Sequence, residues 1–128
     1  MVLKPIYMLV NNLFFATKIV KAAQAMGLEA RAFDSADRVL EASRQKEPSL
    51  VILDGEGLEK EAFRLLTAFR LDGQLSKIPR VGYLSHTARN LKEEMLSAGA
   101  LQVYFKSEFS RELDNLLMRH SGGFPSRV

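Results

Sequence analysis

Three side chains that together could position and neutralise a phosphoryl group follow separate apolar runs of this chain. Asp54 comes directly after the most apolar run, residues 49–53, and Ser85 and Lys106 each follow a later apolar run. A carboxylate, a hydroxyl and an ammonium group that converge on one point could hold a charged group and offset its charge. Taken singly, each residue also has an ordinary structural role, as a turn former, a helix cap or an edge lysine.

These residues lie within a regular alternation of strand-like and helix-like segments. Strands are predicted at 6–10, 29–33, 50–53, 80–84 and 101–105, and helices at about 13–26, from the cap Ser35, at about 58–71, from Thr87 and from the cap Ser110. Parallel strands need crossover helices, so the pattern predicts an α/β fold with a doubly wound, parallel five-stranded sheet. The carboxyl ends of its strands meet at one edge, with the third and fifth strands roughly 10 Å apart, within reach of a lysine.

The bulk composition is that of one ordinary globular domain. The chain has 128 residues, a net charge of +3 and no cysteine, which excludes disulfides and thiolate metal sites. No apolar run approaches the length of a membrane span and no secretory signal is recognisable, so a cytoplasmic protein is expected. The basic residues are scattered among acidic ones, which argues against direct nucleic-acid binding. We predict one domain over residues 1–120, followed by a flexible tail, 121–128.

The order of Asp54, Ser85 and Lys106 on the third, fourth and fifth strands resembles that of bacterial response-regulator receiver domains. The resemblance covers residues 4–120 and implies the CheY-like (βα)5 sandwich with strand order 2-1-3-4-5. It further implies that Asp54 is the phosphoacceptor, Ser85 the switch hydroxyl and Lys106 the amine that contacts the phosphoryl oxygens.

The sequence departs from the receiver pattern where that family holds Mg²⁺. Two adjacent acidic residues are expected after the first strand, but this chain has Asn11 and Asn12. Magnesium is usually held by carboxylates, so two neutral amides should weaken metal binding steeply. Glu56 could compensate by folding back, although a solvent-facing position is expected for it. Asn11, Asn12 and Glu56 thus form a degenerate metal site, and no cofactor is predicted.

Further departures affect the switch itself. Ser107 replaces the usual proline after the lysine, and His86 replaces a small residue and could obstruct the site. Val103 occupies the position of a mobile aromatic residue, and the side chain of Tyr104 should point to the opposite face of the sheet. With fewer neighbouring carboxylates, Asp54 and Lys106 are expected to form a standing ion pair.

These features favour an atypical receiver, or pseudo-receiver, in a two-component or phosphorelay pathway. It would act through protein contact, with Mg²⁺-dependent phosphorylation of Asp54 weakened or lost. A working phosphoacceptor at Asp54 is the alternative, and a flavodoxin-like domain that binds a nucleotide or flavin ranks third, because the turn after the first strand has no glycine. The chain is not expected to be an enzyme beyond slow self-catalysed phosphoryl transfer.

The expected contact surface is formed by the fourth helix, the fifth strand and the fifth helix. Its candidate residues are Arg89, Lys92, Tyr104, Glu108 and Arg111. A histidine kinase or an output protein would bind there, and a homodimer is left open. The sequence does not identify the partner or the pathway.

Overall fold

A parallel sheet of five strands forms the centre of the protein. The computed structural model describes residues 3–120, so the predicted tail 121–128 lies outside the described residues. The strands are β1 (Ile6–Leu9), β2 (Ala30–Phe33), β3 (Leu50–Asp54), β4 (Arg80–Leu84) and β5 (Gln102–Phe105). Their order is β2-β1-β3-β4-β5, and every pair is parallel. The predicted α/β class and strand order are therefore confirmed.

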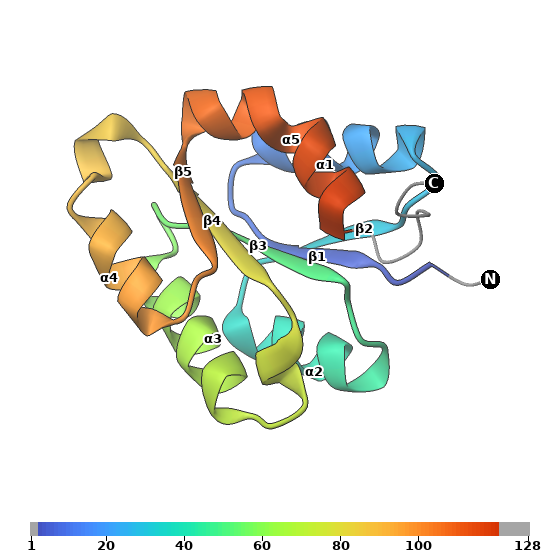
Figure 1. Cartoon of the computed structure of the whole chain (residues 1–128), viewed down its shortest axis with the longest axis horizontal. Coiled ribbons are helices and arrows are strands. Elements are labelled where there is room, and N and C mark those ends of the chain that lie inside the picture. The colour runs from blue at the N-terminus through green and yellow to red at the C-terminus, as the bar shows by residue number, and fades with distance from the viewer. Residues whose placement is uncertain (1–2, 121–128) are drawn as a thin grey trace.

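The connections between the strands are helical. The helices are α1 (Leu13–Ala25), α2 (Ala36–Gln45), α3 (Glu59–Leu71), α4 (Leu91–Ala98) and α5 (Lys106–His120), with short 3₁₀ turns η1 (Leu75–Lys77) and η2 (His86–Ala88). Figure 1 shows α1 and α5 on one side of the sheet, and α2 and α3 on the other. None of the helices in the described part of the chain has the length and apolarity that a bilayer crossing requires.

The sheet separates two apolar layers, because side chains alternate between the faces of each strand. Leu53 and Val103 face the layer formed with α2, α3 and α4, whereas Ile52 and Tyr83 face α1 and α5. All five residues of β3 are buried, as a strand covered on both faces requires. Asp54 ends this strand, so its backbone is held between the two apolar layers.

Two predicted helix starts were wrong. The fourth helix does not begin at Thr87: η2 and a short turn precede α4, which begins at Leu91. The fifth helix begins at Lys106 and not after a cap at Ser110, because the Glu108 carboxylate accepts a hydrogen bond of 2.9 Å from the Phe105 N–H. Such a contact satisfies an N–H that the helix itself leaves unpaired. By contrast, Ser35 caps α2 as predicted, accepting from the Arg38 N–H.

A buried arginine joins the loops at the opposite edge of the sheet. The Arg80 guanidinium donates hydrogen bonds to the carbonyls of Ile78 (2.8 Å) and Gly99 (2.9 Å), and a longer one to Ser76 (3.3 Å). Gly99 has a φ of 121°, a conformation that other residues rarely adopt. Arg80 therefore stabilises the turns that lead into β4 and β5.

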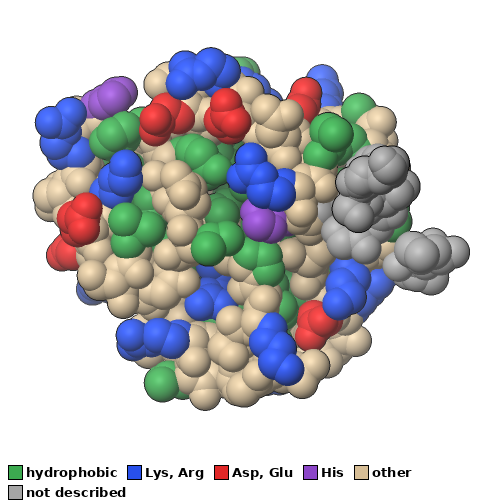
Figure 2. Space-filling model, viewed as in Figure 1, with side chains coloured by type: hydrophobic (Ala, Val, Ile, Leu, Met, Phe, Trp, Pro, Cys, Tyr) green, Lys and Arg blue, Asp and Glu red, His purple; other side chains and the backbone are tan. Residues whose placement is uncertain are grey.

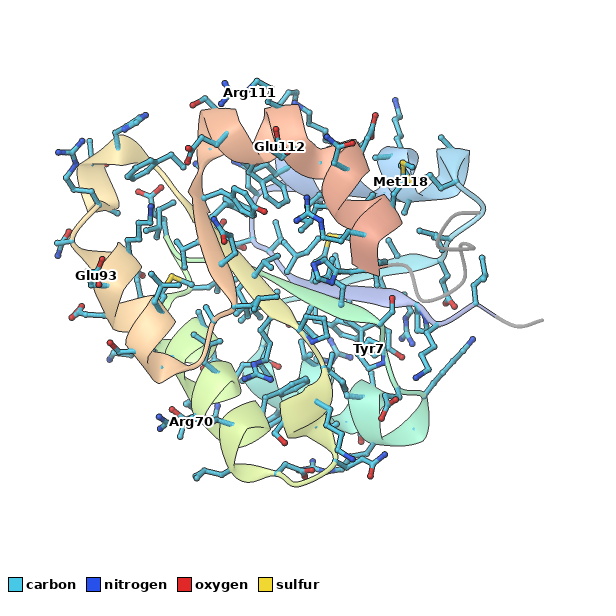
Figure 3. The ribbon with its side chains drawn as sticks, viewed as in Figure 1. Tyr7, Arg70, Glu93, Arg111, Glu112 and Met118 are labelled. Carbon is cyan, nitrogen blue, oxygen red and sulfur yellow. The ribbon has the colours of Figure 1, made fainter. Side chains whose placement is uncertain are left out.

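Replacing Arg80 by methionine should remove these hydrogen bonds while keeping the size of the side chain. We expect Arg80→Met to lower the free energy of unfolding by about 2 kcal/mol, because it leaves buried carbonyls unpaired. Arg70→Met is the matched control, since Arg70 is exposed and extends outward from α3 (Figure 3); a change within about 0.5 kcal/mol is expected. Equal effects in urea denaturation would contradict the assignment.

Candidate functional site

Asp54 lies at the carboxyl end of β3, but the residue is only 4% exposed. It pairs in register with Tyr83 on β4, and its Oδ1 accepts a hydrogen bond of 2.9 Å from the Glu56 N–H. This contact is an aspartate turn, in which the side chain bonds to the backbone two residues on. The turn directs the chain after β3 and brings Glu56 over the strand ends.

An aromatic cluster surrounds Tyr83, the register partner of Asp54. Tyr83 packs between Phe15 of α1, at 4.9 Å between ring centroids, and Phe109 of α5, at 4.8 Å. Burial raises the pKa of the Asp54 carboxyl above its ordinary value, although the Glu56 N–H and the charge of Lys106 act in the opposite direction.

The hydroxyl of Tyr83 is itself buried beside this carboxyl. Within the described residues it has no hydrogen-bond partner of good geometry. Burial, and then the negative charge of Asp54, raise the pKa of this hydroxyl. Asp54 therefore has a buried, neutral phenol and not a cation as its nearest polar side-chain neighbour on β4.

The prediction that Glu56 faces solvent is wrong. Its carboxylate binds the two other candidate site residues. Its Oε1 accepts a hydrogen bond of 2.9 Å from the Ser85 N–H, and its Oε2 accepts one of 2.7 Å from the Ser85 hydroxyl. The Lys106 Nζ lies 3.7 Å from Oε1. The bond from the Ser85 hydroxyl is the largest cause that holds the pKa of Glu56 below its ordinary value, with the Ser85 N–H and Lys106 assisting.

The expected Asp54–Lys106 ion pair is therefore wrong in its partner. Lys106 reaches the strand edge as predicted, but its ion pair is with Glu56, and its ammonium also lies 5.6 Å from the centroid of the Phe15 ring. Glu56 is more accessible than the buried Asp54, so the lysine ammonium loses less hydration when it pairs with Glu56.

Ser85 acts as a hydrogen-bond donor to Glu56 and not as a side-chain cap of the next helix. Its hydroxyl also lies 2.6 Å from the Thr87 hydroxyl. A hydroxyl carries one proton, and the Ser85 proton points to Glu56, so Thr87 donates to Ser85. Glu56, Ser85 and Thr87 thus form a short chain of hydrogen bonds that fixes the start of η2.

The two asparagines after β1 lie at the same edge of the sheet, but one of them caps a helix. The Asn12 Oδ1 accepts a hydrogen bond of 3.1 Å from the Phe15 N–H and so caps α1. Asn11 is exposed. Capping explains why an amide is acceptable at position 12 and leaves one fewer oxygen for a ligand.

The oxygen atoms at this edge are not a suitable set of ligands for a magnesium ion. Over residues 3–120 no three His, Asp or Glu side chains converge in a way that could hold a metal. Asp54 is buried and the Glu56 oxygens already accept hydrogen bonds, whereas magnesium needs charged oxygens that are free to coordinate it.

His86, which follows Ser85, contacts an aromatic ring of β5. Its ring stacks on Phe105 of β5, with 4.4 Å between centroids and 21° between planes. Lys92 of α4 lies 5.3 Å from the centroid of the same Phe105 ring. Tyr104 packs near Phe109, on the side of the sheet opposite Val103, as the alternation along β5 predicted.

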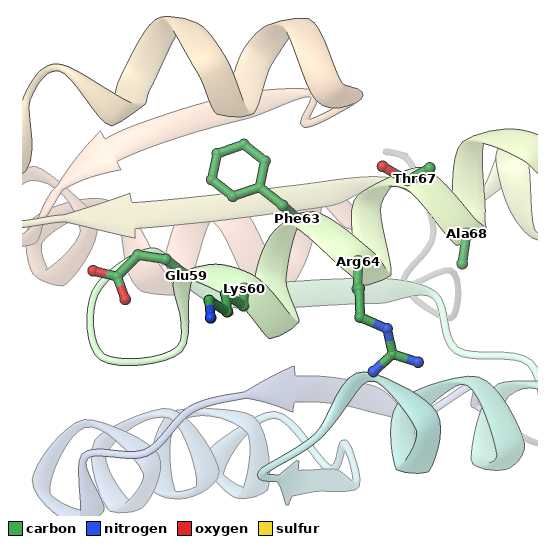
Figure 4. Close-up of a pocket in the computed structure, with 6 residues that line it drawn as sticks. All are labelled: Glu59, Lys60, Phe63, Arg64, Thr67 and Ala68. Atoms are coloured by element: carbon green, nitrogen blue, oxygen red, sulfur yellow. The ribbon is translucent and has the colours of Figure 1, made fainter.

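A separate shallow hollow lies along the outer side of α3 (Figure 4). It is lined by Glu59, Lys60, Phe63, Arg64, Thr67 and Ala68. The Arg64 guanidinium is held by Asp37 of α2 at 2.7 Å, and the rest of the lining is mainly apolar. The hollow has no converging set of reactive groups, so the strand edge remains the candidate site.

Comparison with known proteins supports the fold. No protein-family model matches the sequence, and no curated protein is similar to it. Among solved structures, a response regulator from Hahella chejuensis matches at 20% identity with a TM-score of 0.75, over 88% of this chain and 91% of that one. A response regulator described as putative, from Chloroflexus aurantiacus, matches at 17% identity with a TM-score of 0.78, over 91% and 95%.

A third similar structure is described with a metal in its site. The receiver domain of the sensor histidine kinase PA1611 from Pseudomonas aeruginosa, with magnesium coordinated in its active-site cleft, matches at 16% identity with a TM-score of 0.78. The match covers 94% of this chain and 98% of that domain. The chain has the receiver fold. At these identities the likeness concerns the fold, and the activity must be argued from the site.

Sequence reasoning missed two members of this site, Tyr83 and Thr87. Tyr83 stands opposite Asp54 in the parallel register, and alternation along β4 places it on the same face as Val81. The register would have revealed it. The sequence predicts Thr87 as a helix start, and no sequence pattern indicates that its hydroxyl contacts Ser85.

The burial of Asp54 leads to a pH-dependent prediction. Its ordinary pKa is 3.8, and the folded-state pKa is higher, so the folded state binds more protons between the two values. The stability contributed by this residue therefore falls as the pH rises through that window. We expect Asp54→Asn to be more stable than the wild type at neutral pH, with the difference vanishing below the ordinary pKa.

The comparison of the two proteins isolates Asp54. Glu56 has a lowered pKa and acts with the opposite sign, but it is present in both proteins. Urea denaturation across the acidic range measures the difference. A variant that is less stable than the wild type at neutral pH would contradict the assigned burial of a charged carboxylate.

Proposed function

We propose that this protein is a receiver-like signalling module of two-component or phosphorelay type that works through protein contact. In this proposal, Mg²⁺-dependent phosphorylation of Asp54 is weakened or lost. The observation that carries the proposal is the binding of Ser85 and Lys106 by the Glu56 carboxylate. A phosphoryl group on Asp54 would need those two donors, and an anion of the protein itself already holds them.

Two further observations support a weakened phosphoacceptor. Asp54 is only 4% exposed, and this burial restricts the approach of a phosphodonor to its carboxylate. The neighbouring residues Asn11 and Asn12 are neutral, so no pair of carboxylates offsets the charge of an incoming phosphoryl group through a metal. At most, slow self-catalysed phosphoryl transfer would remain, and the protein is not an enzyme in the ordinary sense.

The contact surface that we propose comprises α4, β5 and α5. Arg89 of the loop before α4 and Arg111 of α5 are exposed, and Lys92 lies against Phe105. Figure 3 shows Glu93 and Arg111 extending outward from α4 and α5. Glu108, in contrast, bonds to the Phe105 N–H, which makes it a structural member of this surface.

The charge on this side of the molecule suits a protein partner. Lys and Arg side chains alternate with acidic ones and do not gather in one basic patch (Figure 2). Mixed charge of this kind gives orientation and specificity between proteins, whereas a nucleic acid selects a continuous positive surface. A kinase, an output protein or a second copy of the chain fits this surface, and an intracellular location follows from such a role.

Phosphorylation of Asp54 can be tested directly. Incubation of the wild type with an acyl phosphate and Mg²⁺, followed by intact mass measurement, should yield no phosphoryl adduct, as for Asp54→Ala. The variant Asn11→Asp/Asn12→Asp/Glu56→Ala supplies two carboxylates and frees Ser85 and Lys106, so we expect it to acquire an adduct. Aspartate at position 12 can still cap α1.

A stoichiometric adduct on wild-type Asp54 would contradict the proposal and establish the working phosphoacceptor. Mg²⁺ titration followed by the amide signals of residues 11, 12 and 54 gives a second readout. We expect saturable millimolar binding in the triple variant and none in the wild type.

A further inference from the structure

The strand edge contains a complete set of donors for one anion. The Ser85 N–H, the Ser85 hydroxyl and the Lys106 ammonium all point to one place, and the Glu56 carboxylate fills it. Two of the contacts are hydrogen bonds to a charged acceptor, at 2.9 and 2.7 Å, which are the stronger kind. The contact with Lys106 is longer, 3.7 Å, and partly exposed, so it contributes less.

The position of Glu56 is set by the backbone. The Asp54 Oδ1 accepts from the Glu56 N–H, which directs the loop back over the sheet. At Gly55, the residue before Glu56, a Cβ atom would contact Leu84 and come within 2.9 Å of the Met95 sulfur. The loop is therefore held close to β4, and the Glu56 side chain reaches Ser85 without a long excursion.

Contacts continue from the anion to the proposed contact surface. The Ser85 hydroxyl is joined to Thr87, which fixes the η2 turn. His86, in the same turn, stacks on Phe105, and Lys92 lies over that ring. Phe105 in turn is bonded through its N–H to Glu108 of α5. One continuous set of contacts thus joins Glu56 to α4, β5 and α5.

We infer that Glu56 is a built-in ligand of an anion subsite formed by Ser85 and Lys106, and that it fixes the 85–88 turn and the His86–Phe105 contact in one arrangement. The subsite takes a carboxylate, and it becomes accessible to a small external carboxylate only when Glu56 is removed. The inference deepens the proposed function and rests on it in treating α4, β5 and α5 as the output surface. The surface is then ready for a partner without a phosphorylation event.

The test is the removal and chemical replacement of this carboxylate. In Glu56→Ala, the ¹H–¹⁵N signals of Ser85, His86 and Phe105 should shift, and exchange of the Ser85 amide should accelerate about tenfold or more, because a charge-assisted hydrogen bond is lost. Acetate should return these signals toward their wild-type positions, whereas chloride at the same ionic strength should not.

Two further variants serve as controls. Glu56→Gln keeps the size of the side chain but not its charge, so we expect a smaller shift with the same direction and no response to acetate. It also keeps the test valid if the alanine variant does not fold. Glu59→Ala removes an equal charge from the exposed start of α3 and should leave the signals of Ser85 and Phe105 unchanged.

Unchanged signals at Ser85 and Phe105 in both Glu56 variants would overturn the inference. Equal responses of Glu56→Ala to acetate and chloride would overturn the assignment of an anion subsite. The experiment uses neither magnesium nor a phosphodonor, so it is independent of Asp54 phosphorylation. A phosphoryl adduct on the wild type together with acetate rescue would refute the weakened phosphorylation of Asp54 and leave the assignment of Glu56 to the anion subsite standing.

Discussion

The arrangement of the strand edge depends on one interaction, the capture of Ser85 and Lys106 by the Glu56 carboxylate. Three donors that could serve an external anion are satisfied from within the chain. The hydrogen bonds to Ser85 are the stronger part of this interaction, since the ion pair with Lys106 is partly exposed and longer. Glu56, Ser85 and Lys106 thereby form a polar network next to the buried Asp54.

Asp54 and Glu56 have opposite environments although they are two residues apart. Burial raises the pKa of Asp54, while hydrogen bonds and a cation lower that of Glu56. Glu56, and not Asp54, is therefore the carboxylate that binds Ser85 and Lys106. In a fold like that of a receiver domain with coordinated magnesium, the hydrogen-bond donors of this chain are bound by an anion of the protein itself.

Much of this could be predicted from sequence because it follows from periodicity and topology. Apolar runs followed by Asp54, Ser85 and Lys106 predicted a parallel sheet with those residues at one edge, and the sheet has that order. The partner of Lys106 could not be predicted in the same way. It depends on the loop geometry set by the Asp54 turn, which decides whether Glu56 points to solvent or over Ser85. The start of the fifth helix was missed for a similar reason. It depends on Glu108 accepting a hydrogen bond from a backbone N–H, which no sequence pattern indicates.

The central claim is most directly tested by an NMR pH titration of the Glu56 side-chain carboxyl carbon in the wild type and in Ser85→Ala. The account predicts a pKa below the ordinary value of 4.5 in the wild type, and a rise toward that value when the Ser85 hydroxyl is removed. A Glu56 that titrates at its ordinary value and is insensitive to Ser85→Ala would contradict the account, because its carboxylate would then be solvated and not bound.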